Sequence, residues 1–305
     1  MTMKRIRILA AATAMMLFAM AGAGCSPQVV TPAATSATTA AGTTGPVGTT
    51  AAGTTAATTS ALSGKIVAAG STSMEKVMKA LGETFTKTNP KVSVEIQGGG
   101  SGAGVTAAAD RTADIGNSSR HLTAAEKTKT PALVETVVAI DGIAIVVNPA
   151  NTVKALTTKQ IADIFTGVIK NWKEVGGADK PIAVIIRESG SGTRDGFEGI
   201  LNIVGKTVPT QEVNETGIVK STVAGNAQAI GYMSLGEIDS SVVAVGVDGI
   251  AATEANVKNA SYKIQRDFVC ITNGQPTGLT KTFLNYILSS AGQAVVATQG
   301  LVKLG

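Results

Sequence analysis

Between residues 63 and 305, short runs of β-branched residues alternate with helical patterns. This alternation predicts an α/β fold with largely parallel sheets, and about 240 residues suit two lobes. The expected strands are Lys65–Ala69, Val92–Gln97, Thr136–Asn148, Pro181–Arg187, Ala229–Met233, Val242–Val247 and Arg266–Thr272. The expected helices are Ser73–Thr86, Gly104–Arg111, Thr158–Phe165, Thr193–Leu201, Ser221–Ala227 and Thr280–Ser289, with a further helix to about Thr298.

Composition excludes several functional classes. A single histidine rules out sites that need two, and two cysteines rule out a four-cysteine zinc site, so we expect no metal and no cofactor. Of the net charge of +5, residues 1–25 supply three positive charges and no acid. The remaining chain lacks the basic patch with interleaved aromatics that indicates nucleic-acid binding.

The N-terminus predicts export. Lys4, Arg5 and Arg7 form a cationic segment, and the apolar run 8–20 has the length of a signal-peptide core. Small residues then precede Cys25, as in a bacterial lipobox, so we expect residues 1–25 to be a lipoprotein signal peptide and Cys25 to be lipidated. Gly22 departs from the usual leucine, which leaves plain cleavage near Ala23 as the alternative.

The next segment, 26–62, contains no charged residue and consists mostly of threonine and alanine. It has neither helical nor strand periodicity, so we expect a disordered tether. With Cys25 lipidated, Cys270 is left alone in the apolar run 268–271 and is expected to be a buried structural thiol.

Four polar loops carry the chemistry. The first loop is 70–73, the second 98–104, the third 114–120 and the fourth 187–194; the first, second and fourth each lie between an expected strand and an expected helix. Free N–H groups at a helix N-terminus, close backbone approach at glycine and Ser/Thr hydroxyls together suit an anion. The alternative is that these serines and threonines only cap helices.

Sequence motifs of nucleotide binding and of hydrolase catalysis are incomplete or absent. Gly98, Gly100 and Ala103 fit a dinucleotide fingerprint, but no acid stands about 20 residues further on. Residues 199–207 resemble a P-loop with one residue too many, and no G-x-S-x-G elbow exists. His121 has no partner in sequence for a catalytic triad, so we expect a solvent-facing loop histidine and no catalytic residues.

Across about residues 64–305 the chain resembles the phosphate-binding protein of bacterial phosphate ABC transporters. The resemblance rests on the order and spacing of the segments 70–73, 98–105, 114–116 with 118–120, 141–144, 187–194, 229–232 and 272–274 with 276–278. It implies a two-lobed class II periplasmic-binding-protein fold, with a hinge of two chain crossings and phosphate in the interlobe cleft. We place the first lobe at 63–146 plus 258–305 and the second at 147–257, with crossings near 145–149 and 257–265.

The family's site transfers onto this chain by motif. Phosphate ligands are expected at Thr72, Ser73, Ser101, Asp141, Arg187, Ser191, Gly192 and Thr193, with Ser119 and Arg120 behind them. Some members carry an Asp where this chain has Ser119, and Asp141 is our candidate for the missing acid. At neutral pH phosphate keeps a proton and sulfate does not, so one buried carboxylate among donors would reject sulfate. Asp141 could instead be a turn residue before Gly142, and Arg187 could instead form an ion pair with Glu188.

The resemblance implies a monomeric, non-enzymatic receptor, held outside the cytoplasmic membrane by a lipid anchor. It would capture inorganic phosphate and deliver it to the permease subunits of an ABC transporter, without nucleic-acid partners. Alternatives are the same scaffold binding sulfate, molybdate or tungstate, a phosphatase or esterase, and an adhesin or sensor.

Overall fold

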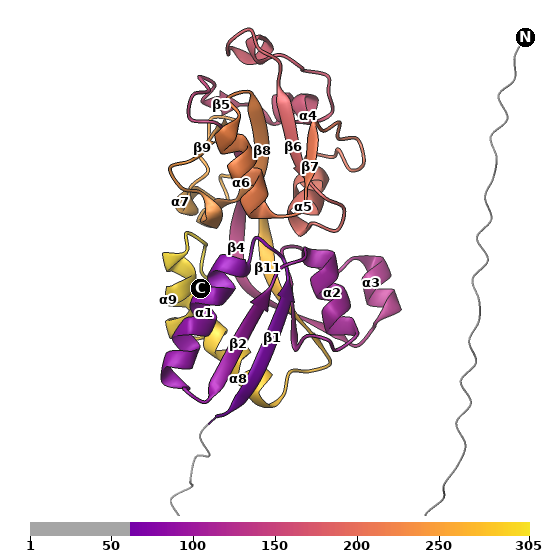
Figure 1. Ribbon diagram of the computed structural model, residues 1–305, viewed down its shortest axis with the longest axis vertical. Coiled ribbons are helices and arrows are strands. Elements are labelled where there is room, and N and C mark those ends of the chain that lie inside the picture. Colours follow the sequence, from indigo (N-terminus) through magenta and orange to yellow (C-terminus); the bar gives the residue numbers. More distant parts are fainter. Residues whose placement is uncertain (1–61) are drawn as a thin grey trace, which may run out of the picture. The chain divides into compact units, whose positions relative to one another are not determined.

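The longest strand, β4 (Leu133–Val147), runs through both lobes of the folded chain (Figure 1). The computed structural model describes residues 62–305. The expected signal peptide, Cys25 and the tether up to residue 61 lie outside the described residues.

The first lobe is a sheet covered by helices. Its strand order is β2-β1-β3-β11-β4, with β1, β2 and β3 parallel and β11 antiparallel to both neighbours. The strands are β1 (Gly64–Gly70), β2 (Val92–Gln97), β3 (Ile115–Ser118) and β11 (Gln265–Asn273). The helices are α1 (Glu75–Thr88), α2 (Ser101–Ala109), α3 (Ala124–Lys129), α8 (Gly278–Leu288) and α9 (Ser290–Thr298).

Hydrophobic spacing explains how α1 packs. Its buried residues recur at helical intervals and include Val77, Leu81 and Phe85, which join the core of this lobe. The Phe85 ring lies 5.1 Å from Phe283 of α8, centroid to centroid. Cys270 of β11 is fully buried in the same core, which confirms the expected buried thiol.

The second lobe continues from β4 through β8 (Ala229–Ser234), β6 (Ala183–Arg187) and β7 (Gln211–Val213), with β9 (Val243–Ala244) also paired to β4. Its helices are α4 (Thr158–Phe165), α5 (Gly192–Ile200), α6 (Thr216–Gly225) and α7 (Glu254–Lys258), with 3-10 turns η1 (Trp172–Val175) and η2 (Leu235–Glu237). Two short strands, β5 (Ala155–Leu156) and β10 (Gly246–Val247), form a separate pair. In the core, Phe197 stacks on Tyr232 with centroids 4.2 Å apart.

The chain crosses between the lobes on β4 and at the start of β11. Strand β4 pairs with β11 up to Gly142 and with β8 from Ile143 onward. Val257, Tyr262 and Ile264 belong to the core of the second lobe. The partner of β4 therefore changes at 142/143, and the residues up to Ile264 pack with the second lobe, while the lobe bounds given above stay a prediction. An uninterrupted apolar strand carries no local signal of where its partner changes.

The α/β class is confirmed, and parallel pairs occur in both lobes. The strands nearest the crossings are antiparallel, unlike the largely parallel sheets that we expected. Strand β3 lies within the segment that we expected to be the third loop. A loop was expected there because Asn117 and Ser118, which are buried, stand where a strand usually has apolar side chains. Among residues 62–305, no helix is both long and apolar enough to span a bilayer.

Candidate functional site

Three strand–loop–helix units deliver polar side chains to the space between the lobes. The first loop joins β1 to α1 and the second joins β2 to α2, both in the first lobe, while the fourth joins β6 to α5 in the second lobe. Hydroxyl groups on these loops are buried rather than solvated: Ser73, Ser101 and Thr193 are each at most 3% exposed. Buried hydroxyls need partners: Ser73 and Thr193 contact each other across the cleft, whereas Ser101 contacts Ser119 of its own lobe.

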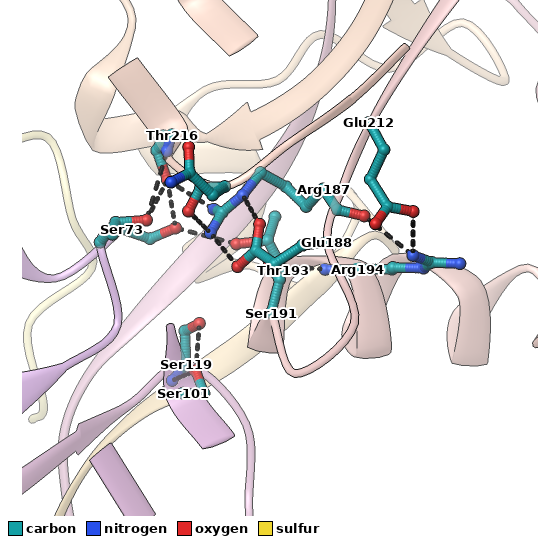
Figure 2. A network of polar contacts seen from close by, with 12 residues as sticks. Ser73, Ser101, Ser119, Arg187, Glu188, Ser191, Thr193, Arg194, Glu212 and Thr216 are labelled. Atoms are coloured by element: carbon teal, nitrogen blue, oxygen red, sulfur yellow. Dashed lines mark hydrogen bonds and ion pairs between the residues drawn. The ribbon is translucent and has the colours of Figure 1, made fainter. Parts of the chain in front are cut away.

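The first loop contacts the second lobe directly. The hydroxyl oxygens of Ser73 and Thr193 lie 2.8 Å apart. The hydroxyl of Thr72 accepts the backbone N–H of Thr216 at 3.2 Å and lies 3.1 Å from the Thr216 hydroxyl. Figure 2 shows Ser73, Thr193 and Thr216 gathered around the guanidinium of Arg187.

The second and third loops meet at the start of α5. Ser101 accepts the backbone N–H of Ser119 at 3.0 Å, and the two hydroxyl oxygens lie 3.2 Å apart. An ideal Cβ on Gly192 would lie 2.3 Å from the Ser101 Oγ and 2.7 Å from the Ser119 Oγ, so only glycine fits there. The N–H of Gly102 donates to the carbonyl of Gly190 at 2.9 Å, which closes the contact between the lobes.

Arg187 ends strand β6 and is 1% exposed. Its Nη1 donates to the Thr216 hydroxyl at 3.0 Å, and its Nη2 donates to the carbonyl of Asn214. Its Nε and Nη2 also bind both carboxylate oxygens of Glu188, which is the ion pair given above as the alternative to a phosphate contact. The backbone N–H of Arg187 donates to the Tyr232 hydroxyl at 3.1 Å. Burial raises the pKa of that hydroxyl, which stays neutral as an acceptor.

The electrostatics favour a negative ligand. Helices α5 and α6 both point their N-termini into the site, where free N–H groups and the helix dipole attract anions. Ser191 caps α5 by accepting the N–H of Arg194, so the expected ligand Ser191 has a structural role as well. Next to Thr72, a groove of about 350 Å³ opens between the lobes; its charged lining has both signs, two lysines and three glutamates: Lys76, Lys79, Glu75, Glu215 and Glu237.

Asp141 lies behind this group and does not hydrogen-bond to the four loops within the described chain. It is fully buried and accepts two bonds from Arg266, one from the Ser234 hydroxyl and one from the N–H of Leu235. Burial raises the pKa of Asp141, and Arg266 acts in the opposite direction. The expectation that Asp141 accepts the proton of a ligand does not fit these contacts, because its acceptor positions are already occupied.

Arg120 and Arg194 brace the surroundings of the site. Arg194 binds Glu212 and donates to the carbonyl of Arg187 (Figure 2). It also binds Glu198, one turn further along α5. Arg120 binds Glu126 in its own lobe and Asp195 in the other. His121 is a loop residue with a half-exposed side chain, between Glu135 and Asp267.

Sequence reasoning missed two residues of this network. Thr216 opens α6, whose start we expected five residues later, because the preceding strand β7 has only three residues. Arg266 was counted as the first residue of an apolar strand. A charged residue inside such a run was the one available signal, since a buried cation requires a partner.

The arrangement can hold a small tetrahedral anion. Loops of both lobes meet here: the Ser73 hydroxyl lies against that of Thr193, and Ser101 and Ser119 lie at Gly192, the first residue of α5, whose N-terminus has free N–H groups. Among residues 62–305, no cluster of His, Cys, Asp or Glu could hold a metal ion.

Comparisons with known proteins relate the whole folded chain to one family. A family model described as a PBP superfamily domain matches residues 33–291. The phosphate-binding protein PstS of Bacillus subtilis is 35% identical over 246 residues, covering 79% of this chain and 81% of that protein. A structure from Clostridium perfringens, assigned as a phosphate ABC transporter substrate-binding protein with bound phosphate, is 44% identical with a TM-score of 0.77 and covers 79% of this chain and 100% of its own. An ABC-type phosphate transport receptor from Vibrio cholerae is 35% identical with a TM-score of 0.65, covering 78% and 100%.

Proposed function

The chain belongs to the family of phosphate-binding proteins of bacterial phosphate ABC transporters, and we propose that it captures inorganic phosphate outside the cytoplasmic membrane and delivers it to an ABC permease. The observation that carries the proposal is the meeting of the two lobes at the N-terminus of α5, where the Ser73 and Thr193 hydroxyl oxygens lie 2.8 Å apart and Ser101 lies against Gly192. Hydroxyls and backbone N–H groups are uncharged donors that suit the oxygens of a tetrahedral anion.

The ligand set is a part of the proposal. Thr72, Ser73, Ser101, Ser119, Arg187 and Thr193 supply side chains, while Gly192 and Thr193 supply backbone N–H groups. Arg187 contributes through Nη1, because Glu188 occupies its other edge. Asp141 and Arg120 support the site without touching the ligand.

The proposal has a direct test in calorimetric titration of the purified, ligand-free protein with phosphate and then with sulfate at pH 7–8. We expect one-to-one phosphate binding with no heat from sulfate. Binding heat with sulfate or molybdate but not with phosphate would assign the scaffold to another oxyanion. The absence of binding heat with every anion would mean that the serines and threonines of the loops only cap helices.

An anchored receptor fits the extracytoplasmic role, and we propose lipidation at Cys25 with residues 26–62 as a tether. Membrane partitioning of the full chain, lost in Cys25→Ser, tests the anchor. Light scattering on the Cys25→Ser protein tests the proposed monomer.

We propose no enzymatic activity, and release of a chromophore from a phosphate ester by the wild type but not by Arg187→Met would contradict that.

A further inference from the structure

A buried ion pair links the site to the chain crossings. Asp141 lies on β4 one residue before the change of partner, and Arg266 is the second residue of β11. Arg266 donates to the Asp141 Oδ2 from Nε at 3.1 Å and from Nη2 at 2.9 Å, and the side chains are 5% and 0% exposed. The Asp141 Oδ1 is bound from the second lobe by Ser234 and Leu235.

Arg266 also contacts the third loop. Its Nη1 donates to the Ser119 Oγ at 3.2 Å. A guanidinium has no acceptor, so the direction of this bond is fixed: Ser119 must use a lone pair toward Arg266. The proton of the Ser119 hydroxyl is then directed away from Arg266.

The orientation of the Ser101 and Ser119 hydroxyls follows from this contact. Ser101 accepts the backbone N–H of Ser119, so its hydroxyl proton is also free to point elsewhere. One of the two hydroxyl protons can bridge the 3.2 Å between the oxygens, which leaves the other for a third acceptor. Both oxygens lie against Gly192, the first residue of α5, where an anion would meet the helix N-terminus.

We propose that Arg266, held in place by Asp141, is a positioning residue that orients the hydroxyls of Ser119 and Ser101 as donors to the bound anion. The inference rests on the proposed function and deepens it by assigning a role to residues behind the ligand. It replaces the expected contact of Asp141 with phosphate by an indirect action through Arg266 and Ser119.

The test is a mutant cycle on phosphate affinity, measured by calorimetry. Replacing both members of a buried pair by apolar residues commonly preserves folding, whereas removing one leaves an uncompensated charge. We therefore compare wild type, Ser119→Ala, the pair Asp141→Leu with Arg266→Met, and the triple variant. We expect roughly tenfold weaker binding in Ser119→Ala and in the pair variant, and no further loss in the triple variant, because Arg266 acts on both serines only through its contact with the Ser119 hydroxyl.

Two results would overturn the inference. One is wild-type affinity in the pair variant, and the other is a triple variant in which the two losses multiply, which would mean that Arg266 acts on the ligand independently of Ser119. Ser118→Ala is the matched control, since the Ser118 hydroxyl donates to the Arg120 carbonyl instead; its effect should multiply with that of the pair variant.

Thermal unfolding shows whether each variant folds, and Arg266→Lys replaces the pair variant if that one does not. The lysine keeps the charge but cannot bind Asp141 and Ser119 with one planar fork, so its binding loss should again vanish in a Ser119→Ala background. Failure of the wild type to bind phosphate would reject the proposed function. If the wild type binds phosphate, but the affinity losses of Ser119→Ala and the pair variant multiply in the triple variant, only this inference is rejected.

Discussion

Arg120 of the first lobe donates from Nε to Asp195 of the second lobe, with 2.7 Å between nitrogen and oxygen. Both Nη atoms of Arg120 bind Glu126 of the same lobe, so the Arg120 side chain is held in the orientation that contacts Asp195. Asp195 lies in the first turn of α5, close to Gly192 and Thr193. The pair therefore joins the first turn of α5, where we propose that the anion binds, to the opposite lobe.

This pair should add to phosphate affinity, because it depends on the closed arrangement of the lobes. Asp195→Asn is expected to weaken phosphate binding by roughly twofold to fivefold, the range of a partly exposed ion pair of about 0.5–1 kcal/mol. The difference from wild type should shrink at about 1 M salt, where charges are screened. Calorimetry at two salt concentrations measures it.

Asp163→Asn is the matched control, since Asp163 pairs with Lys159 on the same helix, α4, and within one lobe. Its phosphate affinity should equal that of wild type. Equal affinities of Asp195→Asn and wild type at low salt would show that the contact across the lobes does not contribute to closure.

Gly192→Ala should block closure while leaving each lobe folded. The added methyl would sit 2.3 Å from the Ser101 Oγ, on the opposite lobe, and opening of the cleft relieves that clash. We expect at least a hundredfold loss of phosphate affinity, with a melting temperature of the ligand-free protein near that of wild type or above it, since alanine favours helix.

Gly199→Ala tests the same helix without the clash, because nothing lies within 4 Å of its added Cβ. That variant should bind phosphate as wild type does. Wild-type binding by Gly192→Ala would mean that the lobes do not approach each other here when the ligand is held.

The local parts of this architecture were readable from the sequence. The loops around Ser73, Ser101 and Thr193 were placed correctly between strands and helices, because strand, turn and helix signals all fall within a few residues. That these loops face one cleft came only from the family resemblance, because the fourth loop follows β6 of the second lobe and no local pattern joins it to the loops after β1 and β2.

The tertiary parts were not readable. The partner of Asp141 is Arg266, 125 residues away, and no spacing rule joins them. Thr216 follows a strand too short to show periodicity. Both misses concern polar residues whose roles depend on side chains far away in the sequence. The ion pair of Arg187 with the adjacent Glu188, in contrast, is the alternative that the sequence already offered.

Cys270 should resist modification until the protein unfolds. Its thiol is fully buried, and burial raises its pKa to about 12, so the reactive thiolate is scarce at neutral pH. In a Cys25→Ser background, we expect no reaction with a thiol reagent in buffer and one thiol in denaturant. Adding Val204→Cys, at a position 68% exposed, should give one fast thiol as a control. A fast thiol without that addition would place Cys270 in a region that opens readily.

Glu237, in the groove beside Thr72, should destabilise the protein when ionised. Burial raises its pKa above the ordinary 4.5, helped by Asp141 and Glu75 and opposed by Lys76 and Lys220. A carboxyl with a raised pKa in the folded state costs stability above that pKa and nothing below 4.5, because only then is it protonated in both states. Glu237→Gln is therefore expected to raise the urea midpoint at pH 7.5, with the gain vanishing as the pH falls toward 4.5.

Glu95→Gln is the control with the opposite effect. It should lower the urea midpoint at pH 7.5, since Lys65 lowers the pKa of Glu95. Equal midpoints of Glu237→Gln and wild type at both pH values would show that this carboxylate is as well solvated in the folded chain as in the unfolded one.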